Sequence, residues 1–513
     1  MRKLLILAFA LVLGLAAKQV YAQGNATLTG SVTDPNGAVV AGAAVKATNK
    51  GTNISYDTQT TDAGLYRFPT LPVGIYTISA EASGFKAAQV ENVTLTVGQT
   101  VTQDVKLEVG APTETVTVQS GGEQLAQPNE SSVSTLLNRT VWENYPLENR
   151  DTNEFINILP GAVPDAFAGS TRGAAVNGAR GGMGNFLVEG YDNNDQGQGG
   201  RGALVSGGIT SISPDAIQEY RVITNNYSAQ YGKAGGFVTD TVLRSGTNEI
   251  HGSLFAYNRI QKLAANDFFS NREGVKDSLV RNQFGGSFGG PIIRDKTFGF
   301  GTVEFHRLRQ GAPLTAVSTT QQFIDFVRTG AFKTFHETDP GGFCVLNLGG
   351  PCPGAFANSA TLGANFQQLQ AANPIPLATT GLTNQAAGLF TGGLLFDDVT
   401  VYPVPVYGDV TVINNSFLNA SRFTGKVDHI MSQRNRFTGT FLLEDSDTGD
   451  THGGSDTTIG VPFLSPGRSI LVGLSWIHDF SPTVINEAKV SYLRHVRDFA
   501  QCPGTEQLPS VVT

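Results

Sequence analysis

Hydrophobic and polar positions alternate along most of the chain, in short runs that are separated by turn-forming residues. Between Ala26 and Val109 these runs recur at the spacing of about 8–12 residues that is typical of a β-sandwich. The first run ends at Asp34–Gly37, where proline presets φ and glycine accepts a positive φ, so a tight turn is expected. The expected strands are Thr27–Thr33, Val45–Asn49, Ile54–Thr60, Leu65–Phe68, Ile75–Glu81, Val90–Val97 and Val101–Val109.

A period of two also dominates the chain after His251. Phe423, Gly425 and Val427 alternate with polar residues, and the alternation resumes after a turn at Ser432–Asn435. Each arm approaches the ~9–11 residues that a tilted strand needs to cross a bilayer. A soluble sandwich strand shows the same alternation, so strand length is what favours a membrane-embedded sheet.

A second pair of expected strands, Ile470–Phe480 and Val484–Arg497, surrounds a short turn at Ser481. Long polar connections are expected at Gln310–Val410 and Glu444–Pro466. Short turns at one end of a sheet and long loops at the other are typical of outer-membrane β-barrels. The second half of the chain therefore predicts antiparallel strands with one side facing lipid and the other facing water.

The N-terminus, Met1–Ala22, has the pattern of a cleaved secretory signal peptide. Two basic residues are followed by the apolar run Leu4–Ala17, and small residues occupy the cleavage positions before Gln23. The alternative, a membrane-spanning helix, requires about 20 apolar residues, which this run does not reach. The mature chain is therefore expected outside the cytoplasm, and no later segment is apolar enough for a spanning helix.

Composition excludes two broad classes of protein. The chain has 513 residues, of which 40% are hydrophobic and 15% charged, and its formal net charge is −8. Enough apolar surface exists to bury, so a disordered chain is excluded. The acidic balance offers no footprint for phosphate groups, so no nucleic-acid partner is expected.

The middle of the chain changes character twice. Glu114–Val118 is a short β-prone segment between glycine and proline residues. It is either the last strand of the sandwich or a strand offered to the sheet edge of a partner. A helical opening is expected at Ser132–Leu159, and the glycine- and asparagine-rich segment Val176–Asp195 follows.

The N-terminal motifs resemble the carboxypeptidase regulatory-like domain, a transthyretin-type sandwich with a carbohydrate-binding-like fold. The matching segments are Gly30–Gly37, Asp62–Phe68 and Leu71–Tyr76. Their aromatic residues offer two interpretations, a sugar platform or a core. Alternating aromatics in strands are more often buried, so Tyr66, Phe68 and Tyr76 are assigned to packing.

Residues 129–248 and the start of the next segment resemble the plug domain of TonB-dependent outer-membrane receptors and its junction with the barrel. Among these receptors the chain is most similar to the Oar-like group, which couples a regulatory-like sandwich to the plug. The motifs that carry this resemblance are Asn177-Gly178-x-Arg180, Glu189-Gly190-x-Asp192-Asn193, Ala229-Gln230-Tyr231-Gly232 and Ser245-Gly246-Thr247-Asn248-x-x-His251-Gly252.

The resemblance implies a function without chemistry of the receptor's own. It places a TonB box at Glu114, Thr115, Val116, Thr117 and Val118. Ligand binding outside would release this segment, TonB would add a strand to it, and the energised inner-membrane complex would displace part of the plug. The implied partners are TonB with that complex, outer-membrane lipid and a bulky ligand, which is a glycan, a peptide or a metal chelate.

The fold class expected from these observations is mainly β, in five segments. They are a signal peptide at 1–22, a sandwich at 23–110, a linker at 111–128, a mixed α/β plug at 129–248, and the N-terminal part of a barrel at 249–513. The family's barrels are 22-stranded, and an open sheet edge in lipid leaves unpaired backbone groups. The sequence is therefore expected to be a fragment of a longer protein.

Binding groups are expected on outer loops and on plug loops near Arg172–Arg201, with no individual ligand-binding residue assigned. The alternative function is a structural or adhesive surface protein that uses the same barrel without transport. No catalytic residue, metal ligand or cofactor is expected. The chain is therefore not expected to be an enzyme.

Three further motifs contain residue types that are found at catalytic, calcium-binding or disulfide sites. Gly285-x-Ser287-x-Gly289 fits the nucleophile-elbow pattern, but its surroundings continue in strand-like steps. Asp445-x-Asp447-x-Gly449-Asp450 lacks the order of a calcium loop and is expected in a solvated loop. Cys344 and Cys352 are expected to form a local disulfide in an oxidising compartment, whereas Cys502 has no evident partner.

Overall fold

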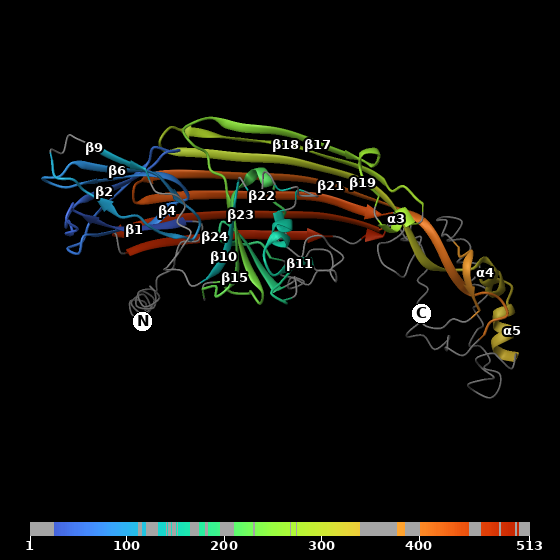
Figure 1. Ribbon diagram of the computed structural model, residues 1–513. Helices are drawn as coiled ribbons and strands as arrows, with labels where there is room; N and C mark the ends of the chain where they lie inside the picture. Colours follow the sequence, from blue (N-terminus) through green and yellow to red (C-terminus); the bar gives the residue numbers. More distant parts are fainter. Residues whose placement is uncertain are drawn as a thin grey trace, which may run out of the picture.

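Strands make up most of the described chain and form three bodies: an N-terminal sandwich, a central domain and a long-strand sheet. Figure 1 shows the sandwich at one end of the long strands and the central domain beneath them. The computed structural model describes residues 25–110, 115–119, 132–139, 141, 145, 150, 152–164, 174–179, 183–194, 210–228, 231–266, 268–272, 274–338, 377–384, 401–450, 463–481, 484–497 and 500–501.

The N-terminal sandwich consists of two sheets around one core. Burial alternates along its strands, and the rings of Tyr66, Phe68 and Tyr76 are all buried, as expected for core residues. One sheet has the order β4 (Leu65–Pro72), β1 (Asn25–Thr33) and β7 (Thr100–Thr102), with β8 (Val105–Lys106) also paired to β1. The other has the order β3 (Ser55–Gln59), β2 (Ala44–Asn49), β5 (Gly74–Glu81), β6 (Ala87–Leu95) and β9 (Thr115–Gln119).

The sequence-based expectations for the sandwich are confirmed at most strands and at the first turn. The carboxylate of Asp34 accepts hydrogen bonds from the amides of Asn36 and Ala38, both at 2.8 Å, and Gly37 has a φ of 85°. The single strand expected at Val101–Val109 is instead divided into β7 and β8. Both pair in parallel with β1, one after the other along its length.

The central domain is built on a five-stranded sheet. Its order is β10 (Val133–Asn138), β15 (Ile217–Asn225), β16 (Phe237–Leu243), β13 (Gly184–Val188) and β14 (Tyr191–Asp192). A small hairpin, β11 (Ala162–Pro164) and β12 (Ala174–Val176), and the 3-10 helices η1 (Thr152–Ile158) and η4 (Pro214–Ala216) flank this sheet.

The helix expected over Ser132–Leu159 was a wrong prediction for its first half. Val133–Asn138 is a strand that pairs antiparallel with β15, whereas Thr152–Ile158 is a 3-10 helix. The short segment includes the β-branched residues Val133 and Thr135, which fit a pleated surface. Its partner strand lies about 90 residues later in the chain, so local spacing did not reveal it.

The long-strand sheet is antiparallel between all neighbouring strands of its main path. That path is β17 (His251–Ile260), β18 (Ser278–Ile293), β19 (Thr297–Thr319), β21 (Tyr407–Ser432), β22 (Asn435–Asp450), β23 (Phe463–Ser481) and β24 (Val484–Arg497). Two short strands, β20 (Thr380–Thr383) and β25 (Ala500–Gln501), pair with β21 and β23.

Connections of very different length join these strands at their two ends. Residues 294–296 and 433–434 form short connections, and β24 begins three residues after β23 ends. Gln433 donates to the carboxylate of Asp57 in the sandwich at 2.9 Å, and Asp295 accepts from Asn248 at 2.8 Å. The other end carries the longer connections, with η5 (Gln261–Leu263), α3 (Phe268–Arg272), α4 (Gln321–Arg328) and α5 (Ala331–Thr338). The expected asymmetry between short turns and long loops is present.

Burial in the long-strand sheet is inverted relative to a soluble protein. Phe423 and Val427 are 38% and 44% exposed, whereas Arg422 and Lys426 on the opposite side of the same strand are 3% and 7% exposed. The polar side of the sheet faces the central domain, and the apolar side faces outward. This is the arrangement that a lipid-facing sheet requires.

Several strands extend further than the alternation predicted. The ten residues Gln310–Thr319 belong to β19, and Glu444–Asp450 belongs to β22, although both were expected in loops. The motif at Asp445–Asp450 is therefore in a strand. The β19–β21 and β21–β22 ladders continue beyond the alternating segments because neighbouring strands satisfy each other's backbone hydrogen-bonding groups, whatever side chains they carry.

Some predicted features lie outside the described residues: the signal peptide, Glu114, parts of Arg172–Arg201, Cys344, Cys352 and Cys502. Ser287 is described and lies within β18, where its hydroxyl contacts that of Ser253 at 2.8 Å. A nucleophile elbow needs a strand-to-helix turn, so this serine is not placed as one. Among the described helices, none is long and apolar enough to cross a membrane.

Candidate functional site: the interface of the central domain

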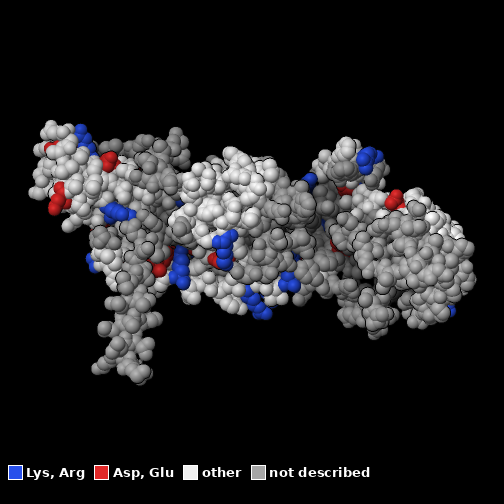
Figure 2. Space-filling model, turned by 90° about the horizontal axis from the view of Figure 1, so that it is seen from below, with Lys and Arg blue, Asp and Glu red and all other residues white. Residues whose placement is uncertain are grey.

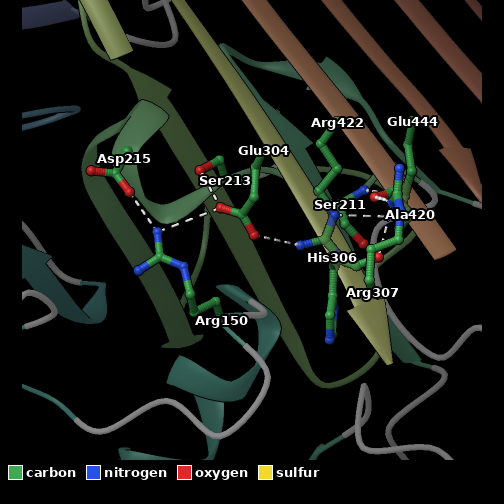
Figure 3. A network of polar contacts seen from close by, with 10 residues as sticks. All are labelled: Arg150, Ser211, Ser213, Asp215, Glu304, His306, Arg307, Ala420, Arg422 and Glu444. Atoms are coloured by element: carbon green, nitrogen blue, oxygen red, sulfur yellow. Dashed lines mark hydrogen bonds and ion pairs between the residues drawn. The ribbon is translucent and has the colours of Figure 1, made fainter. Parts of the chain in front are cut away.

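The candidate site is the buried interface between the central domain and the polar side of the long-strand sheet. At its centre lies Glu304 of β19, whose side chain is completely buried. One carboxylate oxygen accepts a hydrogen bond from the Ser213 hydroxyl at 2.6 Å and lies 3.4 Å from Arg150. The other lies 3.4 Å from Arg422 of β21, so this carboxylate connects the sheet to two segments of the central domain (Figure 3).

The network around Glu304 continues on both sides. Arg422 also contacts Glu444 of β22 at 3.5 Å, and Glu444 accepts a hydrogen bond from the Ser211 amide at 2.8 Å. On the other side Arg150 pairs with Asp215, which begins η4 together with Pro214 (Figure 3). Buried charges of this kind are tolerated only when each charged group has a partner. The contacts of Ser211, Ser213 and Asp215 therefore hold the segment 211–215 against the polar side of the long-strand sheet.

A second charged contact joins the part of the central domain that follows β13 to the polar side of the long-strand sheet. The carboxylate of Glu189 accepts from the Leu243 amide at 2.6 Å and from the Lys426 ammonium group at 2.8 Å. Lys489 of β24 donates to the Glu189 carbonyl oxygen at 3.2 Å. The motif beginning at Glu189, recognised in the sequence, is therefore a contact between the central sheet, β21 and β24.

Close approach of glycine backbone adds shape complementarity to these charges. The ring of Tyr191 lies against Gly473 of β23, where a Cβ atom would come within 2.4 Å of the ring. Gly246 lies between the carbonyl oxygens of Gly290 and Gly299, where a Cβ atom would come within 2.6 Å of both. Only glycine fits these two positions, so the central domain fits closely against the sheet.

The sandwich contacts the central domain at the turn that follows β6, in addition to the hydrogen bonds that Asn248 donates to Gly51 and Thr52. The Val97 amide donates to the carboxylate of Glu219 on β15 at 2.7 Å, and Arg221 donates to the Val97 carbonyl oxygen at 3.1 Å. Burial raises the pKa of Glu219 from 4.5 to about 7, opposed by the hydrogen bond from Val97 and by the charge of Arg221. This contact is therefore expected to respond to pH.

Stability at this contact is expected to decrease as pH rises from about 4.5 to about 7. The folded protein binds the Glu219 proton more tightly than the unfolded chain does. Its contribution to the free energy of unfolding is therefore complete below pH 4.5 and is lost as the pH rises to about 7. The shift corresponds to about 3 kcal/mol. Urea unfolding followed by tryptophan fluorescence at pH 5 and pH 8 measures it.

Glu219→Gln should remove this part of the pH dependence because the amide does not titrate, while the exposed control Glu108→Gln should retain it. An unchanged pH profile in Glu219→Gln would contradict the assignment.

The sandwich also rests directly on the long-strand sheet at its short-turn end. Arg436 of β22 donates to the Thr70 carbonyl oxygen at 2.9 Å and to the Thr70 hydroxyl at 2.8 Å, and lies over the Tyr56 ring. A cavity of about 120 Å³ remains where the three bodies meet, lined by charged residues such as Glu189, Asp428 and Lys489. The bodies are therefore joined by polar contacts around a hollow and also by apolar contacts, because Phe298 packs in the sandwich core and Leu442 and Leu471 pack in the core of the central domain.

The described residues hold no group of three or more His, Cys, Asp or Glu side chains that could bind a metal ion. The candidate TonB box is described in part: Thr115–Val118 form most of β9, which pairs in parallel with β6 from Ala87 to Glu91. Within the described sheet β9 is the edge strand. This pairing agrees with the first of the two interpretations made from sequence, in which the segment is the last strand of the sandwich.

Comparison with known proteins identifies the long-strand sheet. A family model described as outer membrane beta barrel domain matches residues 242–511, more than half of the chain. The chain belongs to the outer membrane beta barrel family. Its location is the outer membrane, and the outward apolar side of the sheet faces lipid. A second model, described as carboxypeptidase regulatory-like domain, matches residues 27–108, as the sequence motifs predicted.

A curated relative supports the predicted resemblance to TonB-dependent receptors. The chain is 28% identical over 318 residues to the TonB-dependent transporter Oar of Myxococcus xanthus. The match covers 58% of this chain and 28% of the relative, so the chain spans less than a third of that transporter.

Two solved outer-membrane proteins show weaker structural similarity. The outer membrane transporter YddB from Escherichia coli is 9% identical with a TM-score of 0.41, over 70% of this chain and 38% of that one. A mutant of the ferric enterobactin receptor PfeA from Pseudomonas aeruginosa is 13% identical with a TM-score of 0.40, over 71% and 40%.

Sequence reasoning found some interface residues of this outer membrane beta barrel protein and missed others. Glu189, Gly246 and Asn248 lay in motifs that were singled out, and all three make contacts between bodies. Glu304 and Arg422 were not singled out. The signal that was available is the charge of each residue at a position of the polar side of its strand, next to the outward apolar residues Phe305 and Phe423.

Proposed function

We propose that the protein is part of an energy-coupled receptor that takes up a bulky ligand across the outer membrane, with TonB and its inner-membrane complex as partners. The observation that carries this proposal is the central domain held against the inner side of the sheet by buried charged groups, above all Glu304. Charge pairs with hydrogen-bond partners hold a domain firmly but separate into hydrated groups when they are pulled apart. Such an interface suits a domain that closes a pore and is displaced during transport.

The proposed coupling segment is Glu114, Thr115, Val116, Thr117 and Val118. Four of these residues lie in β9, whose outer edge has no neighbour among the described strands. An extended segment at a sheet edge is a suitable site for β-strand addition, in which backbone hydrogen bonds provide affinity. TonB would pair with this edge and pull on β9.

A pulling force has a short path from β9 to the interface. Residues 120–131 connect β9 covalently to β10, which pairs with β15 over Val133–Asn138. β15 carries Glu219 and follows η4, which contains Asp215, a partner of Arg150. Tension on the segment before β10 would therefore act on β15, the strand that directly follows the segment bound to Arg150 and Glu304.

Deletion of residues 114–118 in the full-length protein is expected to abolish ligand uptake and to leave ligand binding at the cell surface intact. The matched control is deletion of residues 124–128, which shortens the linker equally and retains β9. Uptake is measured by growth of a knockout strain, complemented with each variant, on a panel of glycans, peptides and metal chelates. Normal uptake without residues 114–118 would overturn the proposal and favour a structural or adhesive role.

A further inference from the structure

The sandwich lies on the polar side of the long-strand sheet, which also carries the central domain. Phe298 of β19 and Ile430 of β21 pack against the core of the sandwich, and Phe298 is only 1% exposed. Phe298 is separated from Glu304 by an even number of positions, so both side chains face the same side of the sheet. The same holds for Ile430 and Arg422 on β21. The sandwich and the central domain therefore share one side of the sheet.

The two domains occupy successive levels along that side. On β22, Arg436 near the short-turn end donates to the Thr70 carbonyl oxygen of the sandwich at 2.9 Å, whereas Leu442 packs in the core of the central domain. On β21, Lys426 contacts the Glu189 carboxylate of the central domain at 2.8 Å. The sandwich therefore lies between the central domain and the short-turn end of the strands, where Figure 1 shows it.

Phe298, Ile430 and Arg436 are named here the sandwich seat, because these side chains of the sheet contact the sandwich directly. Beside the seat, Gln433 donates to the Asp57 carboxylate at 2.9 Å, and both side chains are exposed. Water replaces a hydrogen-bond partner that is lost at an exposed position, so such a contact contributes little net stability. The sandwich has a core of its own, and it therefore leaves the seat as a folded unit when these contacts break.

We propose that the sandwich is an inner gate, placed in series with the central domain, and that a bulky ligand passes only after the sandwich has left its seat. This inference rests on the proposed uptake function and adds a second closed point to it. The cavity that remains where the three bodies meet has a volume of about 120 Å³, whereas a site for a drug-sized ligand has roughly 300–1,000 Å³. Displacing the central domain alone therefore leaves the sandwich in the path of the ligand.

The position of β9 connects this gate to a pulling force. Thr115–Gln119 pair in parallel with β6 of the sandwich, and residues 120–131 then lead to β10 of the central domain. A force on β9 therefore acts directly on the sandwich, and it acts on the central domain only through the connecting segment. The expected order is release of the sandwich first and displacement of the central domain second.

A reversible disulfide that holds the sandwich at its seat tests the proposal. A Cβ atom at Gly51 would lie 3.8 Å from the Cβ atom of Thr247, within the range of about 3.5–4.5 Å that a disulfide requires. Thr247 lies between β16 of the central domain and β17 of the sheet, so the bond adds no link between those two bodies. The variant is the full-length protein with Gly51→Cys and Thr247→Cys, in a background whose native cysteines are replaced by serine.

The probe is calcein, a bulky polar dye, enclosed in vesicles that contain the protein. Urea is added below the concentration that unfolds the sheet, in order to displace the central domain. The reduced variant is expected to release calcein, the oxidised variant is expected to retain it, and a reductant added to the oxidised sample should start release. The control pair Thr48→Cys/Ser55→Cys, whose native hydroxyls lie 2.9 Å apart within the sandwich, should release calcein in both states.

A second variant tests the gate in the opposite direction and without cysteines. Arg436→Gln shortens the side chain and removes its two hydrogen bonds to Thr70, so calcein release should begin at a lower urea concentration than in wild type. Arg434→Gln replaces an exposed arginine on the adjoining turn, and as the matched control it should leave release unchanged.

Two kinds of failure are distinguishable. Equal release from the reduced and oxidised cysteine variant, or an unchanged urea dependence in Arg436→Gln, would overturn the inner gate and leave the uptake function standing. Retention of calcein by every protein, wild type included, would mean that displacing the central domain opens no pore, and the proposed uptake function would fail together with the gate.

Discussion

Replacing Glu304 by alanine is expected to lower the free energy of unfolding by about 3–5 kcal/mol, because two arginines are left in a buried site without their shared carboxylate. Arg422 is 3% exposed and Arg150 is 15% exposed, so water cannot replace the lost partner at Arg422. The Ser213 hydroxyl also loses its acceptor. The measurement is urea unfolding of the protein in detergent, followed by tryptophan fluorescence.

Two further variants separate charge from shape. Glu304→Gln keeps an acceptor for Ser213 and nearly the same volume, so its loss should be smaller than that of Glu304→Ala. Glu91→Ala is the control for an exposed pair, since Glu91 contacts Lys50 at 3.0 Å while both side chains are more than a third exposed, and it should cost less than 1 kcal/mol. Equal effects at Glu304 and Glu91 would contradict the role assigned to the buried network.

Gly473→Ala is expected to separate the central domain from β23 and to destabilise the protein by about 1–3 kcal/mol, the usual cost of overpacking. The new Cβ atom would lie 2.4 Å from the Tyr191 ring, a distance that neither the ring nor the strand backbone accommodates without moving. Hydrogen exchange at Tyr191 and along β13 should increase as that contact opens. Urea unfolding supplies the change in stability.

The sheet offers a matched control on its other side. At Gly439 of β22 a Cβ atom would meet only Leu474, at an ordinary 3.7 Å, so Gly439→Ala should be neutral or slightly stabilising. In the background Tyr191→Ala, the substitution Gly473→Ala should lose most of its cost because the clash is gone. Additive effects of the two substitutions would show that they do not act through the same contact.

The three bodies are joined in a way that bears on the proposed transport. The central domain contacts the sheet through the Glu304 and Glu189 networks, and the sandwich contacts the central domain through Glu219. Seen from below, the described surface is mostly uncharged, with Lys and Arg side chains standing singly (Figure 2). Many of the charges that hold the bodies together are thus inside the molecule, where breaking a pair has the largest effect.

Much of the fold was predictable because successive residues of a strand face opposite sides of the sheet, so a strand with one apolar and one polar environment shows an alternating sequence. The sandwich strands, the turn at Asp34–Gly37 and the pair of strands around residues 433–434 follow from alternation and turn chemistry alone. The prediction was wrong where pairing outweighs local pattern: Val133–Asn138 is a strand because β15 lies beside it, and Gln310–Thr319 is a strand because β21 does. Neither partner is near in sequence.

The sequence by itself determined that the chain is rich in β-strands, that its second half has one apolar and one polar side, and that its motifs resemble those of TonB-dependent receptors. The tertiary structure alone decided which polar side chains meet. Glu304 is 91 residues from Ser213 and 118 from Arg422, and these three side chains converge only because the sheet curves around the central domain. A buried charge pair forms only where both partners come into contact. Alternation along a strand predicts the side of the sheet that a residue faces, but it does not predict which distant residue that side chain contacts.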